Sequence, residues 1–322
     1  MIIFSKNTSH SFSLDKNVTN LLKFFACILI ALAHYSGYAL ANGVSSSFVY
    51  NFIAAFGGYV GVALFFFFSG YGLMKSEQKK KSIKLTDFFT KRLRRTYFPA
   101  VLVSALWLII AYFIDLTMLS NNNYIWGVFW NFNDEVMWFV KVIIIMYLIF
   151  FIYRYIVVIY SSSTDFYRFL FLIVVAFASY LCIRLVFDAY AAASVPFFFI
   201  GIAVADFNEI FRRITTSFVV VCGFSILILL LMYYFRSENF VLHCCINYIV
   251  VFFMLVLFSR FDIRIAQMPR WISDTSYDVY LVHYKTHLLN ISLFAVDTIY
   301  TFVIGTVITT LIFNKLRKVF HI

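Results

Sequence analysis

Lys23 and His34 are ionisable residues inside an otherwise apolar segment, LLKFFACILIALAHYSG over residues 21–37. They are 11 residues apart, which in an α-helix is about three turns plus 20°, so both lie on one helix face. The helical rise separates them by about 16 Å along the axis. An imidazole at the deeper position can take a proton from a hydroxyl, because it titrates near neutral pH. The pattern indicates a cation near the cytoplasmic surface and a general base past the membrane midplane.

Each of these residues also has a structural interpretation, and the spacing alone leaves both open. Lys23 can extend its ammonium to the lipid headgroups, and His34 can form an interhelical hydrogen bond. An ionisable group at membrane depth costs about 2.5–3.5 kcal/mol on insertion scales, so its usual place is a bundle interior or a water-filled cavity. A bundle interior is therefore expected for the face that carries both residues.

The composition predicts a membrane protein. Of the 322 residues, 63% are hydrophobic and 13% are charged, which is more apolar surface than a soluble domain could bury. Apolar runs of roughly the 20 residues that a spanning helix needs recur along the chain. The five cysteines lie in apolar runs without CxxC or Cys/His spacing, so no disulfide framework, zinc site or other metal site is indicated. The expected fold is all-α and polytopic.

Ten transmembrane helices account for both the apolar runs and the charges. They are expected at 19–41, 56–74, 96–116, 136–158, 169–187, 194–208, 217–235, 243–259, 272–292 and 298–314. With a cytoplasmic N-terminus, inner segments hold 21 of the 26 Lys and Arg and outer connections hold one, Arg236. This asymmetry predicts that both termini are cytoplasmic. The basic residues flank apolar segments and do not form a soluble basic face, which argues against nucleic-acid binding.

This topology divides the chain into three parts. Residues 1–18 form a cytoplasmic N-terminal segment, 19–316 a single transmembrane domain with a basic cytoplasmic loop at 75–95, and 317–322 a cytoplasmic tail. A competing interpretation is a signal peptide that is cleaved at the small-residue pattern ALANG, residues 39–43. It is disfavoured because the leader would be too long and would carry His34 in its apolar region.

Several motifs along the chain resemble those of the acyltransferase-3 family of bacterial membrane O-acyltransferases, which includes O-antigen and exopolysaccharide acetylases. The first is the K-x10-H relation of Lys23 and His34, similar to the family's R-x10-H. The others follow in the family's order: FFFFSGY from Phe65, RLRRTYFP with Arg92 and Arg95, WFV from Trp138, PFFFIGIAV from Pro196, and SYDVYLVH from Ser276 to His283. Each fragment is weak alone, whereas their order over residues 20–314 is fairly specific.

The resemblance implies an enzyme that moves an acyl group, usually acetyl, from cytoplasmic acyl-CoA to a hydroxyl of a cell-surface or secreted glycan. It implies His34 as the catalytic base, with Lys23, Arg92 and Arg95 binding the coenzyme A of the co-substrate. It also implies substrate binding by Ser69, Trp138, Tyr277, Tyr280 and His283. Lys141, inside a predicted span, is a further substrate-binding candidate that could stabilise the thioester oxyanion, and an ion pair with Asp134, Glu135 or Asp188 explains it equally well. Lys23 departs from the family's arginine, and a lysine offers a point charge where an arginine offers a planar fork.

The basic segment 75–95 suits a phosphate-bearing carrier, since it holds nine cations against Glu77 and Asp87. The positive-inside rule or attraction to anionic lipids explains the same cations equally well. His283 and His287 have the i, i+4 spacing of a metal site, but no carboxylate or cysteine pattern completes one. An interhelical hydrogen bond is the preferred interpretation of that pair.

The expected localisation is the cell membrane of a bacterium, crossed many times. The expected partners are the lipid bilayer, acyl-CoA (acetyl-CoA above all), a glycan or lipid-linked saccharide acceptor, and polysaccharide-assembly proteins. The alternative function is a transporter or glycan flippase whose intramembrane Lys, Arg and His line a path. That alternative favours inverted repeats and Gly/Pro-broken helices, and no such repeat is found in the sequence.

Overall fold

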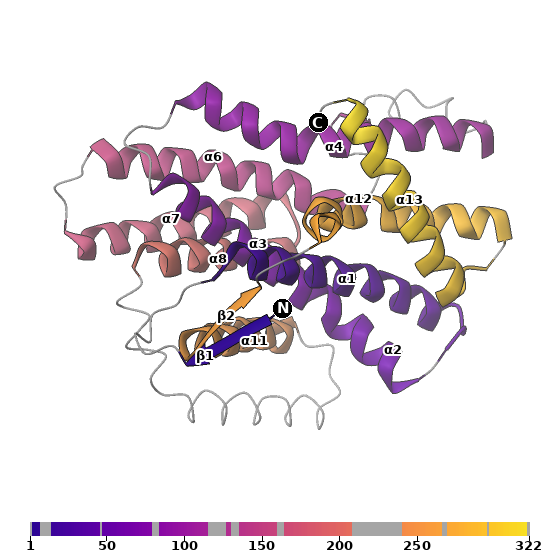
Figure 1. The fold of residues 1–322 in the computed structure, drawn as a ribbon, viewed down its shortest axis with the longest axis horizontal. Helices are drawn as coiled ribbons and strands as arrows, with labels where there is room; N and C mark the ends of the chain where they lie inside the picture. Colours follow the sequence, from indigo (N-terminus) through magenta and orange to yellow (C-terminus); the bar gives the residue numbers. More distant parts are fainter. Residues whose placement is uncertain are drawn as a thin grey trace.

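The protein is a bundle of long helices (Figure 1). The computed structural model describes residues 2–6, 14–45, 47–78, 84–114, 127–129, 135–159, 164–207, 240–265, 269–294 and 296–320. Within these residues, seven helical segments are long and apolar enough to cross a membrane. The predicted class, a polytopic all-helical membrane protein, is therefore confirmed.

Most of the long helices follow the predicted spans closely, and α4 starts well before its predicted span. They are α1 (Lys16–Ala41), α2 (Phe48–Phe52), α3 (Gly58–Glu77), α4 (Leu85–Ile114), α6 (Trp138–Ile159), α7 (Asp165–Val186), α8 (Ala189–Asp206), α11 (Phe240–Arg260), α12 (Arg270–Phe294) and α13 (Ile299–Val319). A π-helical turn, Ile53–Gly57, joins α2 to α3, and a 3-10 turn, Glu135–Met137, precedes α6. The predicted span at 217–235 lies outside the described residues.

Local capping residues fix where three of these helices begin. The side chain of Asp15 accepts a hydrogen bond from the backbone N–H of Asn17 at the start of α1. Asp188 accepts one from Ala191 at the start of α8, at 2.7 Å. Thr298 opens α13 with a reciprocal capping box to Thr301. Such caps satisfy backbone N–H groups that have no partner within the helix.

Helices α1 and α12 pack in parallel, and α13 runs antiparallel to both. Phe24 of α1 meets Trp271 near the start of α12, with ring centroids 5.7 Å apart. Further along the same two helices, Tyr38 meets His287 at 4.3 Å. At the other end of α13, Asn314 donates a hydrogen bond to the buried carboxylate of Asp278 at 2.7 Å. These three helices position the predicted base.

Helices α3 and α8 approach each other through glycine. A Cβ atom at Gly70 would lie 1.9 Å from the carbonyl oxygen of Phe198, and one at Gly201 would lie 2.2 Å from that of Phe67. Association of membrane helices relies on close packing of this kind, because lipid is as apolar as the side chains. The SGY motif therefore contributes a packing contact at Gly70.

Two short strands, which the sequence did not predict, join the N-terminus to a distant connection. Strand β1 (Ile2–Lys6) pairs antiparallel with β2 (Phe261–Ile265). Asn17, in the first turn of α1, donates a side-chain hydrogen bond to the carbonyl of Ile265 at 2.7 Å. A ladder cannot extend across a bilayer, so both segments lie on the same side of the membrane. That this is the cytoplasmic side stays a prediction.

The basic segment before the third predicted span is helical from Leu85 onward. Phe88 is buried and stacks on Phe150 of α6, with ring centroids 6.1 Å apart. Asp87 in the first turn favours the helix N-terminus electrostatically. The segment is therefore amphipathic, and it extends α4 well beyond the apolar window that predicted residues 96–116.

Candidate active site

His34 of α1 and His283 of α12 face each other inside the bundle. Their ring centroids are 5.4 Å apart, with the planes inclined by 30°. His283 is fully buried, and His34 is half-buried, with its ring edge toward Tyr284 at 6.0 Å. The parallel packing of α1 and α12 thus brings together the predicted base and the last residue of the S-Y-x-x-Y-L-x-H motif.

The neighbours of His283 define which of its nitrogens can accept a proton. Nδ1 lies 2.7 Å from the carbonyl oxygen of Tyr280 and 3.2 Å from that of Val279. A carbonyl only accepts hydrogen bonds, so in the neutral ring Nδ1 carries the hydrogen and Nε2 carries the lone pair. Nε2 is buried and has no hydrogen-bond partner in the described part of the chain. Buried polar atoms are normally paired, so this lone pair beside His34 suits a bound hydroxyl.

Lys23, in the N-terminal half of α1, lies near Arg92 of α4. His34 is about three turns further along α1. Arg92 and Cys27, which lies one turn after Lys23 in α1, are both near enough to Lys23 to interact with it electrostatically. Arg92 donates a hydrogen bond to Ser76 Oγ at 3.1 Å and lies 3.6 Å from the buried carboxylate of Glu77. Lys23 and Arg92, two predicted coenzyme-binding cations, therefore lie near each other, and the buried carboxylate of Glu77 offsets part of their positive charge.

The third predicted coenzyme-binding residue, Arg95, is not brought into that contact. It stands three residues after Arg92 on α4 and is exposed. Its guanidinium therefore lies on the surface of the helix that carries Arg92. Recruitment of Arg95 by a bound carrier stays a prediction.

Tyr277 and Tyr280 brace α12 against its neighbours. Their rings stack at 6.2 Å, and the hydroxyl of Tyr277 donates to the carbonyl of Thr96 in α4 at 2.8 Å. The hydroxyl of Tyr280 donates to the carbonyl of Val136, also at 2.8 Å. Both hydroxyls thus have protein partners, which gives them a structural role beside the substrate contact that the motif predicts.

Replacing Tyr277 by phenylalanine is expected to lower the free energy of unfolding by about 0.5–1.5 kcal/mol, the usual net value of one hydrogen bond. The midpoint of thermal unfolding in detergent measures this loss. Tyr300→Phe, at an exposed position of α13, is the matched control for loss of a tyrosine hydroxyl. If Tyr277→Phe instead left stability unchanged and weakened substrate binding, the bracing role would be contradicted.

Of the remaining predicted substrate residues, only Trp138 is linked to this centre by a described contact, and Ser69 and Lys141 lie against other parts of the bundle. Trp138 is half-buried and contacts Phe139, whose ring edge meets Tyr280 at 5.4 Å. Ser69 is buried on α3, next to the glycine that packs on α8. Lys141 directs its ammonium over the ring of Phe187, 5.9 Å from the centroid, where α7 passes to α8. Their substrate roles stay predictions.

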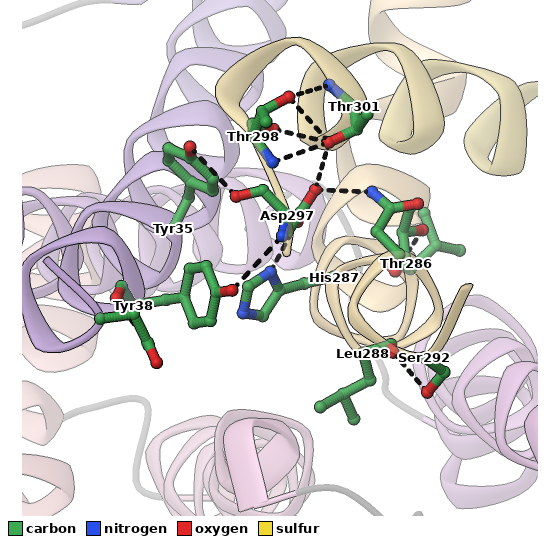
Figure 2. A network of polar contacts seen from close by, with 12 residues as sticks. Tyr35, Tyr38, Thr286, His287, Leu288, Ser292, Asp297, Thr298 and Thr301 are labelled. Carbon is green, nitrogen blue, oxygen red and sulfur yellow. Dashed lines mark hydrogen bonds and ion pairs between the residues drawn. The ribbon is translucent and has the colours of Figure 1, made fainter. Parts of the chain in front are cut away.

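Sequence reasoning missed the partner of His287. Nδ1 of His287 lies 2.6 Å from Oδ2 of Asp297, a fully buried residue in the connection between α12 and α13 (Figure 2). Asp297 directly precedes Thr298, the N-cap of α13. An acidic residue at a predicted helix start was the sequence signal that could have pointed to Asp297. In the residues that the structure describes, no group of three or more His, Cys, Asp or Glu side chains is placed to hold a metal.

Comparison with known proteins identifies the fold and the chemistry of the chain in general terms. Residues 18–313 match the family model of an acyltransferase domain. No curated protein and no solved structure matches the chain. The matched region contains α1, α12 and the paired imidazoles between them, and on this evidence the chain belongs to the acyltransferase-3 family and is a multi-pass membrane acyltransferase.

Proposed function

We propose that this protein transfers an acyl group, in the first instance acetyl, from cytoplasmic acyl-CoA to a hydroxyl of a cell-surface or secreted glycan, with His34 as the general base. The observation that carries the proposal is the meeting of His34 with His283 in the bundle interior. A purely structural pair of imidazoles would give no reason for the buried Nε2 of His283 to lack a hydrogen-bond partner among the described residues. The proposed localisation is a bacterial cell membrane, and polysaccharide-assembly proteins are proposed as partners.

The donor end of the site is the Lys23–Arg92 pair. Phosphate groups of coenzyme A carry several negative charges, and arginine binds phosphate through two parallel hydrogen bonds. Arg92 is held in orientation by Ser76 and by the rings of Phe88 and Tyr147. The Lys23–Arg92 pair lies near the predicted cytoplasmic surface, where acyl-CoA is present. Helix α1 connects this pair to His34, about 16 Å away along the helix axis.

The reaction needs only acid–base chemistry from the protein. His34 takes the proton of the acceptor hydroxyl while its oxygen attacks the thioester carbonyl. The carbon–sulfur bond then breaks, and the coenzyme A thiolate leaves and receives the proton from the His34 imidazolium. His283 Nε2 accepts a hydrogen bond from another hydroxyl of the acceptor. This contact helps to hold the reacting hydroxyl against His34. An ester and free coenzyme A are the products, and no proton is gained or lost overall.

The proposal is tested by comparing glycan acylation with and without this protein. Mass spectrometry of the surface glycan is expected to show acyl groups that disappear when the protein is removed, and purified protein is expected to consume acetyl-CoA. Flux of a glycan across proteoliposomes without acyl-CoA consumption would support the transporter alternative and overturn the proposal.

Replacing Lys23 by methionine is expected to weaken acetyl-CoA binding by about tenfold, the size of one lost charge-assisted contact. Isothermal titration with coenzyme A measures the change. Lys23→Arg, which restores the family residue, is expected to bind at least as tightly as the wild type. Lys315→Met, an exposed cation near the end of α13, is the matched control. Equal binding by Lys23→Met and Lys315→Met would remove Lys23 from the donor site.

A further inference from the structure

The connection between α12 and α13 holds a buried carboxylate that orients a third imidazole. Both oxygens of Asp297 are used: Oδ2 contacts His287 Nδ1 at 2.6 Å, and Oδ1 accepts hydrogen bonds from Asn290 at 2.9 Å and Thr301 at 2.7 Å (Figure 2). Asp297 is 0% exposed. The carboxylate is therefore fixed in place by two helices, and it fixes His287 in turn.

The same connection is tied to the end of α1 that lies beyond His34. The backbone N–H of Asp297 donates to the hydroxyl of Tyr38 at 3.3 Å, and the hydroxyl of Tyr35 donates to the carbonyl of Asp297 at 3.5 Å. The rings of Tyr38 and Phe302 stand edge-on to His287, with centroids at 4.3 and 6.1 Å. Aromatic rings thus line the imidazole on the side of α1 and on the side of α13.

The carboxylate determines which nitrogen of His287 is available. A carboxylate accepts hydrogen bonds, so in the neutral ring Nδ1 carries the hydrogen and Nε2 presents a lone pair directed away from Asp297. A structural link between α12 and the connection would use Nδ1 alone. His283 stands one turn earlier on the same face of α12, and its buried Nε2 has no hydrogen-bond partner in the described residues.

We propose that the Asp297-oriented His287, with the half-buried ring of Tyr38, forms the acceptor subsite for a polyhydroxylated substrate, a sugar residue, at the end of the bundle opposite to Lys23 and Arg92. This inference rests on the proposed acyl transfer. Sugars offer hydroxyl donors on their edges and C–H groups on their faces, which suit an imidazole lone pair and aromatic rings respectively. One sugar hydroxyl donates to His287 Nε2, and a neighbouring hydroxyl donates to His34. His287 is therefore a binding and positioning residue, while His34 stays the base.

Two substitutions separate this role from a structural one. His287→Asn places an amide nitrogen where Nδ1 lies, so the contact with Asp297 is kept and the Nε2 acceptor is lost. His287→Gln places an amide oxygen near the position of Nε2, so an acceptor is kept and the Asp297 contact is lost. Surface-glycan acylation is measured by mass spectrometry in cells that carry each variant or the wild type. Coenzyme A binding by the same purified proteins is measured by isothermal titration.

His287→Asn is expected to bind coenzyme A like the wild type and to lower glycan acylation about tenfold, as for one lost hydrogen bond. His287→Gln is expected to retain more acylation than His287→Asn. Wild-type acylation by His287→Asn, or loss of coenzyme A binding together with acylation, would overturn the acceptor subsite. A wild type that neither acylates the glycan nor binds coenzyme A would instead overturn the proposed function on which the inference rests.

Discussion

Replacing His34 by alanine is expected to lower the rate of acyl transfer by about 10²- to 10⁴-fold, the usual contribution of a positioned general base. An alcohol is a poor nucleophile at neutral pH, so the reaction depends on a general base. Among the described residues, His34 is the one that occupies the histidine position of the family's first-helix motif, and its ring stacks on that of His283. The rate is measured as ester formed from radiolabelled acetyl-CoA in membranes that contain equal amounts of protein.

The controls for this experiment come from the same helix. Gly37→Ala changes an exposed position with no atom within 4 Å of the added Cβ, so it reports any effect of substitution on membrane insertion. His34→Ala should also retain coenzyme A binding, because Lys23 lies about three turns away along α1, on the predicted cytoplasmic side, next to Arg92. Full glycan acylation by His34→Ala would assign the proton transfer to another group, with His283 the next to test.

His283→Gln should have a smaller effect than His34→Ala if His283 only accepts a hydrogen bond, because an amide oxygen can still accept. The comparison also bears on the two imidazoles as a unit. Groups that act together give non-additive losses, so the double variant should be little worse than His34→Ala alone. The three rates would therefore show whether His34 and His283 act together or independently in acyl transfer.

Much of the fold was predictable because membrane helices are specified by local composition. A run of apolar residues long enough to cross lipid must satisfy its own backbone, so it becomes a helix wherever it occurs. Predicted and observed bounds agree within a few residues for α1, at 19–41 and Lys16–Ala41. The start of α4 differed more, since burial of Phe88 against α6 extends that helix into a charged segment.

The strand pairing could not be predicted for a different reason. Ile2–Lys6 and Phe261–Ile265 are more than 250 residues apart in the chain, and neither is long enough to show a clear alternation. Their pairing depends on the bundle that brings the two segments together. Local propensity carries little information about contacts of that kind.

The site was predictable in part. Helical spacing placed Lys23 and His34 on one face, and the motif resemblance added His283. The spacing could not show that α1 and α12 are neighbours or that they run in parallel. Asp297 was missed because its partner His287 lies on the preceding helix, and a short connection gives no periodicity from which to infer a contact.

Replacing Gly70 by alanine is expected to destabilise the bundle by more than about 3 kcal/mol, above the usual 1–3 kcal/mol for overpacking a core. The added Cβ would lie 1.9 Å from the carbonyl oxygen of Phe198, and a backbone atom cannot turn aside as a flexible side chain can. Helices α3 and α8 must therefore separate. Gly201, which faces Phe67 in the same way, shows that both helices use glycine for this approach.

Gly72→Ala is the matched control, because it makes the same change two residues away on α3 where no atom lies within 4 Å of the new Cβ. It should be neutral or should stabilise the helix by up to about 1 kcal/mol, the difference in helix propensity between the two residues. The thermal midpoint and the monodisperse fraction after size-exclusion chromatography are compared for both variants. Equal behaviour would mean that α3 and α8 do not pack through Gly70. If only Gly70→Ala lowers the thermal midpoint and the monodisperse fraction, the glycine of the SGY motif stabilises the fold. Replacing it would then remove activity by unfolding the bundle, with no direct effect on His34.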